Sequence, residues 1–207
     1  MNIDNQNPES LAFERLLFFS DAVFAIAITL LAIDIRLPES PHGAAVESRL
    51  SSLTPHVIAY VVSFFQVAQF WNAHHQLFRY VVRYDSALIW LNMLFLLLIA
   101  FLPVPTSVLG EMGLTSASVI FLASCLSLLG LAELTLWLHA SRELLGEHVS
   151  KSTRQRTTIK IVIVTAVFAL SIAIAPFSPL AAVLSWFLIW VGHAITDRRH
   201  RASTAEQ

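Results

Sequence analysis

The sequence predicts an all-α, polytopic membrane protein with six transmembrane helices. Of its 207 residues, 56% are hydrophobic and 13% are charged, whereas about 25% of a typical soluble domain is charged. The mean hydropathy is +0.67. Four stretches contain no Asp, Glu, Lys or Arg; they are 29, 25, 21 and 36 residues long, at 50–78, 86–110, 112–132 and 161–196. A helix of about 20 apolar residues crosses a bilayer core of about 30 Å, so most of the chain is expected to lie within a membrane.

We expect the helices at residues 13–35, 55–78, 86–108, 114–140, 158–175 and 180–196. The first precedes the uncharged stretches and is the one that carries several charges. The second, third and fourth fill the first three stretches. The last stretch is too long for one crossing, and Pro176 and Pro179 divide it because proline lacks a backbone donor and disrupts a helix. Tryptophans near several helix ends are typical of membrane interfaces; they are Trp71, Trp90, Trp137, Trp186 and Trp190.

The distribution of basic residues predicts the orientation. Six crossings place both termini on one side, and 11 of the 13 Lys and Arg residues fall on that side; only Arg36 and Arg49 fall on the other. The positive-inside rule therefore places both termini in the cytoplasm. We interpret residues 1–207 as one six-helix subunit, with 198–207 a short cytoplasmic tail that is basic and then polar. The basic connection between the fourth and fifth helices could contact anionic lipid.

Composition and motifs argue against several other classes. The net charge of −1 gives no basic surface for nucleic acid. Cys125 is the single cysteine, which excludes an internal disulfide and a zinc site built on cysteines. The six glycines form no phosphate-binding loop, and no Gly-Tyr-Gly carbonyl filter is present. We expect no enzyme activity, no cofactor and no metal site, and the polar, acidic N-terminus is not a signal peptide.

The first helix differs from the others because it holds four acidic or basic residues, Glu14, Arg15, Asp21 and Asp34. A charge at membrane depth costs about 2.5–3.5 kcal/mol, so such residues usually face protein or a water-filled cavity. At 3.6 residues per turn, one narrow stripe forms with Thr29 at its margin and Asp21 pointing well away; its members are Ile26, Leu30 and Ile33, extended back through Ala22, Phe19 and Arg15. Periodicity alone favours lipid contact or packing for this stripe.

A motif in this helix resembles that of the transmembrane protein 175 family of potassium channels. Arg15-x-x-x-Phe19-Ser20-Asp21 is followed directly by Ala-Val-Phe-Ala-Ile-Ala-Ile-Thr-Leu-Leu. Two further segments support the resemblance, Trp71-Asn72-Ala73-His74-His75 and Leu91-Asn92 followed by Phe101-Leu102-Pro103-x-Pro105-Thr106. The last three helices match the family only in pattern.

The resemblance implies a homotetramer whose central pore is lined by the first helix of each subunit. It implies a potassium-permeable channel of a prokaryotic cell membrane, with no carbonyl filter and with potassium as the permeant ion. The implied constriction is Ile26, with Leu30 and Ile33 as the next layers and Thr29 as the layer that prefers potassium. A buried polar network that fixes the first helix is also implied; we assign it to Arg15, Phe19, Ser20, Asp21, Trp71 and His74.

Geometry suggests how this network would connect. Arg15 and Asp21 lie on different faces, so a direct contact is not expected, and Trp71 or His74 of the second helix could join them. A proton-coupled transporter that uses Asp21 and His74 is the main alternative function. An intramembrane enzyme or haem protein is less consistent, because adjacent histidines point to different sides of a helix. Glu133 and His139 in the fourth helix receive no role.

Overall fold

The protein is described by a computed structural model that covers residues 8–33, 35 and 52–205, with side chains described up to residue 198. Over these residues the regular structure is helical apart from one isolated bridge, Val81 to Leu145. The helices are α1 (Pro8–Leu31), α3 (Thr54–Phe78), α4 (Ser86–Phe101), α5 (Pro103–Met112), α6 (Ser116–Glu143), α7 (Lys151–Ile174), α8 (Pro179–Leu184) and α9 (Phe187–Ala205).

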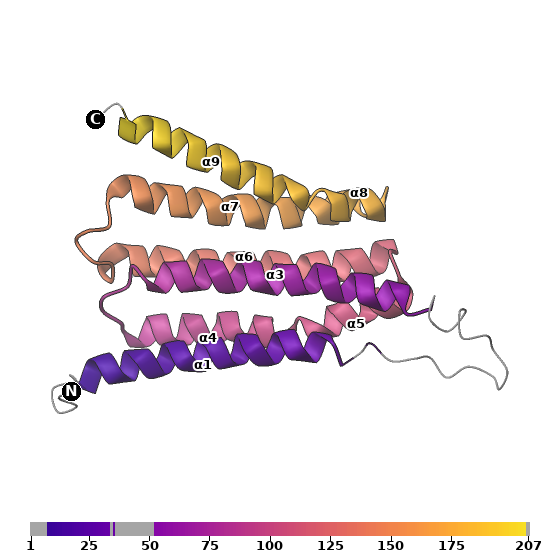
Figure 1. Ribbon diagram of the computed structural model, residues 1–207, viewed down its shortest axis with the longest axis horizontal. Coiled ribbons are helices and arrows are strands. Elements are labelled where there is room, and N and C mark those ends of the chain that lie inside the picture. Colours follow the sequence, from indigo (N-terminus) through magenta and orange to yellow (C-terminus); the bar gives the residue numbers. More distant parts are fainter. Residues whose placement is uncertain (1–7, 34, 36–51, 206–207) are drawn as a thin grey trace.

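The helices form an elongated bundle of six passes (Figure 1). Helix α1 lies along one long edge, packed against α3 and α4, and α9 lies along the opposite edge, packed against α7. Helix α6 is the central element, with α4 and α5 on one side and α7 on the other. The start of α1 and the end of α9 lie at the same end of the bundle, as an even number of passes requires.

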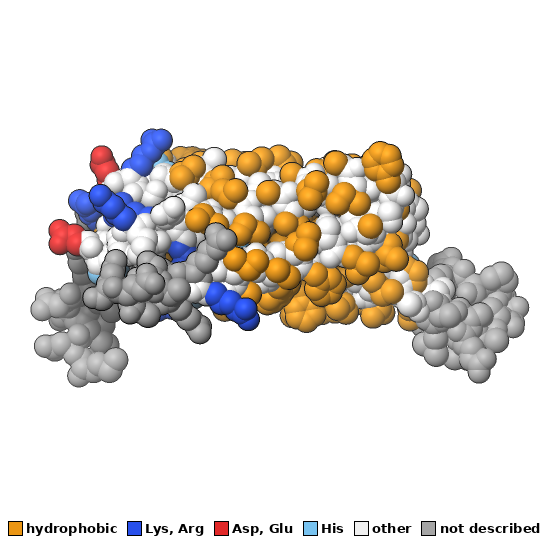
Figure 2. Space-filling view, turned by 90° about the horizontal axis from the view of Figure 1, so that it is seen from above, with side chains coloured by type: hydrophobic (Ala, Val, Ile, Leu, Met, Phe, Trp, Pro, Cys, Tyr) orange, Lys and Arg blue, Asp and Glu red, His pale blue; other side chains and the backbone are white. Residues whose placement is uncertain are grey.

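Charged side chains gather at the end of the bundle where α1 starts and α9 ends. Figure 2 shows the basic and acidic groups at that end of one face, while hydrophobic side chains cover most of the remainder. Arg36 and Arg49, the two basic residues predicted on the opposite side of the membrane, lie outside the described residues, as does Asp34. A long apolar surface with charged groups gathered at one end fits a bilayer better than water.

Four passes are long and apolar enough to cross a membrane: Ser86–Met112, Ser116–Glu143, Lys151–Ile174 and Pro179–Arg198. These correspond to four of the six expected spans. Helices α1 and α3 are not among them. Helix α1 carries Glu14, Arg15 and Asp21, and α3 carries several Gln, Asn and His residues. These two passes pack against each other, and α1 also packs against α4 and α3 against α5.

Two expected helices are broken rather than continuous. The expected helix at 86–108 divides into α4 and α5 at Leu102, because Pro103 cannot donate the next backbone hydrogen bond. The expected helix at 180–196 divides into α8 and α9 at Ser185 and Trp186. There the Trp186 N–H donates to the Val183 carbonyl (3.1 Å) and the Leu188 N–H to the Ser185 carbonyl (2.9 Å). Both bonds span three residues, the tighter 3₁₀ spacing.

Several helix boundaries differ from the sequence prediction. Helix α1 runs from Pro8 to Leu31 rather than over 13–35, so Ile33 lies in the turn that follows it. Helix α7 begins at Lys151 rather than near residue 158, because the Ser150 hydroxyl caps it by accepting the Thr153 N–H at 3.2 Å. Helix α9 continues to Ala205, so it extends into the expected tail at 198–207. Nothing between Arg198 and Ala205 is a proline or glycine, so no residue there disfavours continued helix.

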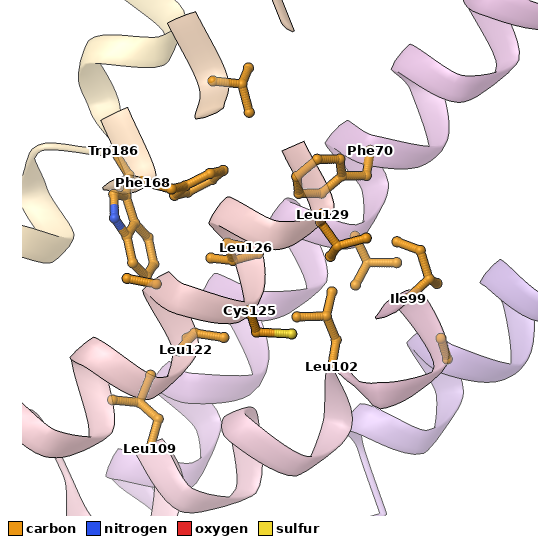
Figure 3. Packing of buried hydrophobic residues seen from close by; sticks show 14 of the residues in the cluster. Phe70, Ile99, Leu102, Leu109, Leu122, Cys125, Leu126, Leu129, Phe168 and Trp186 are labelled. Atoms are coloured by element: carbon orange, nitrogen blue, oxygen red, sulfur yellow. The ribbon is translucent and has the colours of Figure 1, made fainter. Parts of the chain in front are cut away.

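Aromatic and aliphatic side chains from every layer fill the core. Phe70 of α3 stacks on Phe168 of α7 with ring centroids 6.2 Å apart, and Phe168 meets Trp186 edge-on at 5.6 Å. Figure 3 shows these rings beside Leu126 and Leu129 of α6. Helix α6 is thus buried on several sides, where it packs against α4, α5 and α7.

Asp85 caps the N-terminus of α4, at the charged end of the bundle. Its carboxylate accepts the Leu88 N–H at 2.7 Å and lies 3.0 Å from His139 Nε2 of α6. The hydrogen bond from Leu88, assisted by His139, lowers the pKa of the Asp85 carboxyl below its ordinary range. The cap therefore fixes the start of α4 against α6 as long as Asp85 is ionised.

Candidate functional site

The stripe predicted on α1 lies on the surface of the subunit. Ile26, Leu30 and Ile33 are 59%, 39% and 54% exposed. Thr29 is also exposed, and its hydroxyl donates to the Ile26 carbonyl at 2.8 Å. Phe19 is exposed on the same side of the helix.

The opposite side of α1 is packed into the bundle. Phe24, Ala27 and Leu31 are almost completely buried. The helix is therefore apolar on both sides but covered on only one. An exposed apolar surface of this length is typical of a face that contacts lipid or another protein chain.

Behind this face, a chain of buried hydrogen bonds joins α3, α4 and α1. His74 Nε2 lies 2.8 Å from Asn92 Oδ1, Asn92 Nδ2 donates to Ser20 Oγ at 3.0 Å, and Ser20 Oγ donates to the Leu16 carbonyl at 2.9 Å. An amide oxygen can only accept, so Nε2 of His74 carries the proton. All three side chains are buried, and each polar group in the chain has a partner.

Aromatic rings enclose His74. Its ring is stacked on Phe95, with centroids 5.5 Å apart and an interplanar angle of 8°, and it contacts Phe78 at 4.5 Å and Phe24 at 5.5 Å. These rings exclude water from the hydrogen bond to Asn92. The low local dielectric strengthens the bond and makes its loss more costly.

Asp21 has a different partner. Its Oδ1 accepts a hydrogen bond from Trp71 Nε1 at 2.9 Å, and the Trp71 ring stacks on His75 at 5.6 Å. Trp71, rather than His74, therefore connects α3 to Asp21. Arg15 is exposed and has no ion pair with the described residues, so the structure does not join it to Asp21.

The structure separates the expected network into parts. Ser20 and His74 belong to one chain of hydrogen bonds, Asp21 and Trp71 to another, and both brace α1 against its neighbours. Phe19 lies outside both, on the exposed face. Asn92, the residue that links His74 to Ser20, was not predicted. An amide within an otherwise apolar run, LIWLNMLFLLL, was the signal that could have identified it.

The chemistry of this site is limited. The described residues hold no group of three or more His, Cys, Asp or Glu side chains that could bind a metal ion. The exposed face of α1 offers aliphatic and aromatic surface with the hydroxyl of Thr29 beside it. Such a face can pack, contact lipid or border a narrow passage.

Comparison with known proteins shows which family the helix with this exposed face resembles. The family described as "Endosomal/lysosomal potassium channel TMEM175" matches residues 15–103, a segment that contains most of α1 and all of α3 and α4. A protein of Streptomyces collinus named as a potassium channel is 36% identical over 167 residues, which cover 78% of this chain and 81% of that protein. A potassium channel of Chamaesiphon minutus is 41% identical over 106 residues, which cover 50% of this chain and 52% of that protein.

A solved structure agrees in fold. The crystal structure of a lysosomal potassium-selective channel TMEM175 homolog from Chamaesiphon minutus superposes with a TM-score of 0.78 at 27% identity. The superposition covers 89% of this chain and 98% of that one. The likeness therefore extends over the whole bundle, beyond the segment that carries the motifs.

Proposed function

The chain belongs to the TMEM175 family of potassium channels, and from this premise we propose that four copies assemble around a central pore lined by α1. It is a membrane channel subunit rather than an enzyme. The observation that carries the proposal is that the motif-bearing helix leaves its aliphatic stripe uncovered in the single subunit. Four such stripes facing one axis would cover one another and enclose a path for ions.

The constriction of this pore is Ile26. A ring of four isoleucine side chains presents no polar atom, so water and hydrated ions are excluded when the ring is narrow. Leu30 and Ile33 extend the apolar path by further layers. Opening requires the ring to widen, because an isoleucine side chain cannot replace the hydration shell of potassium.

Thr29 is the residue that discriminates among ions. It lies about 4.5 Å along the helix axis from Ile26, at three residues of 1.5 Å rise. Its hydroxyl proton is engaged by the Ile26 carbonyl, which leaves the oxygen lone pairs available to a passing cation. Four such oxygens would form a polar layer next to the hydrophobic one.

The side chains packed behind α1 hold it in a fixed position against α3 and α4, from which the pore opens. Ser20 and Asp21 are its two attachment points, through Asn92 and His74 and through Trp71, respectively. Arg15 and Phe19 lie on exposed surface, where a neighbouring subunit would meet them. We assign these residues to assembly and gating rather than to ion selection.

The protein lies in the cell membrane of a prokaryote with both termini in the cytoplasm. Lipid covers the outer faces of the bundle, potassium is the permeant ion, and the subunit has no carbonyl filter. The transporter alternative loses support from the geometry, because Asp21 and His74 are hydrogen-bonded to different partners. A proton relay between them would need a direct or water-bridged path.

Substitution of the stripe tests the proposal. Ile26→Asn introduces polar atoms into the ring, so we expect a constitutively leaky pore. Thr29→Ala should conduct but prefer potassium less. Basal current and reversal potential would be measured for each purified variant in planar bilayers with potassium on one side and sodium on the other.

Leu97→Asn is the matched control, because Leu97 is equally exposed but lies on α4. It should leave both basal current and reversal potential as in the wild type. The gate is misplaced if Ile26→Asn conducts no more than the wild type at rest. An unchanged reversal potential in Thr29→Ala would remove Thr29 from ion discrimination.

A further inference from the structure

A second polar site lies inside the subunit, away from α1. A partly open cavity of about 370 Å³ is bordered by α3, α6, α7 and α9, and α1 contributes no residue to it. Its lining includes Gln69 of α3, Glu133 of α6 and His193 of α9. Trp190 of α9 and Phe65 of α3, both largely exposed, border the same space.

Glu133 is the unusual member of this lining. It is 2% exposed, and its Oε1 has no hydrogen-bond partner within the described part of the chain. Gln69 Nε2 and His193 Nε2 are likewise buried and unpartnered there. Buried polar atoms are rarely left unsatisfied, so three around one cavity indicate that the space is occupied by a polar guest or by water.

The basic residues of the lining do not neutralise Glu133. Arg156 and Lys160 of α7 each form an ion pair with Asp197 of α9, with nitrogen to oxygen distances of 2.7 Å. Neither forms an ion pair with Glu133 in the described structure. The carboxyl group therefore lies deep in the subunit, while the cations that could have paired with it are held by Asp197.

We propose that this cavity binds a small organic molecule through a primary ammonium group. An ammonium group has three N–H donors, which match the Glu133 carboxylate, the Gln69 amide oxygen after rotation of the amide, and the unprotonated His193 nitrogen. The rings of Trp190 and Phe65 suit the organic part of the ligand and favour a cation by interaction with their faces.

Other ligand classes fit less well. A metal ion would need more ligands, and the described residues contain no group of three or more His, Cys, Asp or Glu. A fully ionised anion has no N–H or O–H donor to offer to the Glu133 carboxyl oxygen. The amine site goes beyond the channel proposal, since it uses none of the residues placed at the pore.

Binding can be tested on the purified full-length protein with benzylamine as the probe and benzyl alcohol as the uncharged analogue of the same shape. We expect benzylamine to raise the unfolding temperature in detergent in a saturable manner, because a ligand bound to the folded state stabilises it. Benzyl alcohol should have much less effect. Equal effects of the two compounds, or none from benzylamine, would overturn the proposal.

Glu133→Gln keeps the shape of the side chain and removes its charge, so it should abolish the benzylamine shift. Glu143→Gln, an exposed position on the same helix, is the control and should retain it. A full shift in Glu133→Gln contradicts the site. If Glu133→Gln does not fold, Gln69→Leu and the comparison of the two compounds on the wild type give the same decision. Binding is read without ion flux, so failure of the channel proposal and failure of this one are distinguishable.

Discussion

At the scale of single residues, Asn92 is the most constrained position near the proposed pore helix. Its amide accepts a hydrogen bond from His74 and donates one to Ser20, so one side chain of α4 pairs with buried polar groups of both α3 and α1. Each partner is buried. A buried donor that loses its acceptor costs more than the hydrogen bond itself contributes, because water cannot replace the acceptor.

Asn92→Leu should therefore destabilise the subunit by about 1–3 kcal/mol, the cost of leaving the His74 N–H unsatisfied. Ser20 would be affected less, since its own hydroxyl still donates to the Leu16 carbonyl. The double variant Asn92→Leu with His74→Leu removes both partners and should recover much of the loss. Denaturation of the purified proteins in detergent measures these differences in stability. If Asn92→Leu alone is as stable as the wild type, the role given to Asn92 is contradicted.

At the scale of helices, the passes were predictable because long uncharged stretches have few alternatives in a membrane. The breaks within two of them were not predicted. Pro103 lacks a backbone donor and so marks the break at Leu102, although the predicted helix continued through it. Ser185 and Trp186 include no proline or glycine, so the tighter turn there required the structure. The exposed stripe of α1 follows from 3.6-residue periodicity, but the partners of its polar side do not. The pattern of a helix face does not specify which neighbouring helix it contacts. The role of Asn92 and the cavity around Glu133 could therefore be identified only from the structure.

Close approach of α6 and α7 gives a test at this scale. A Cβ atom added to Gly130 would lie 3.2 Å from the Thr165 Cα and closer still to the Thr165 side chain. Gly130→Ala should push the helices apart and cost about 1–3 kcal/mol, as overpacking does.

The control is Gly192→Ala on α9, where the three atoms nearest to the added one all belong to the Ile163 side chain rather than to the backbone. Its loss of stability in thermal unfolding should be clearly smaller. Equal stability of Gly130→Ala and the wild type would show that α6 and α7 can separate freely.

At the scale of the whole molecule, the bundle has two unlike ends. Lys and Arg residues lie beside the start of α7 and the end of α9, while the connection between α5 and α6 lies at the other end (Figures 1 and 2). Charge asymmetry of this kind sets orientation during insertion. The orientation proposed above places the charged end in the cytoplasm.

Cysteine labelling checks this orientation with little background, because Cys125 is buried. Ser152→Cys lies at the start of α7 and Leu114→Cys between α5 and α6; both positions are exposed. In intact cells an impermeant maleimide should label Leu114→Cys and should reach Ser152→Cys only after permeabilisation. The reverse pattern would invert the topology.

The assembly itself gives the last prediction. Beside the stripe, α1 exposes Ala22 and Ala25, and the exposed Ala32 follows its last residue. Small residues let helices of neighbouring chains approach closely in a membrane. Light scattering in detergent should give the wild-type protein a mass near 92 kDa, four times 23.0 kDa. Ala25→Leu should reduce that mass by separating the subunits, whereas Ala169→Leu, exposed on α7, should not. A monomeric wild type would rule out the tetramer. A tetrameric Ala25→Leu would show that the subunits meet through another surface, and α1 would then lose its place at the axis.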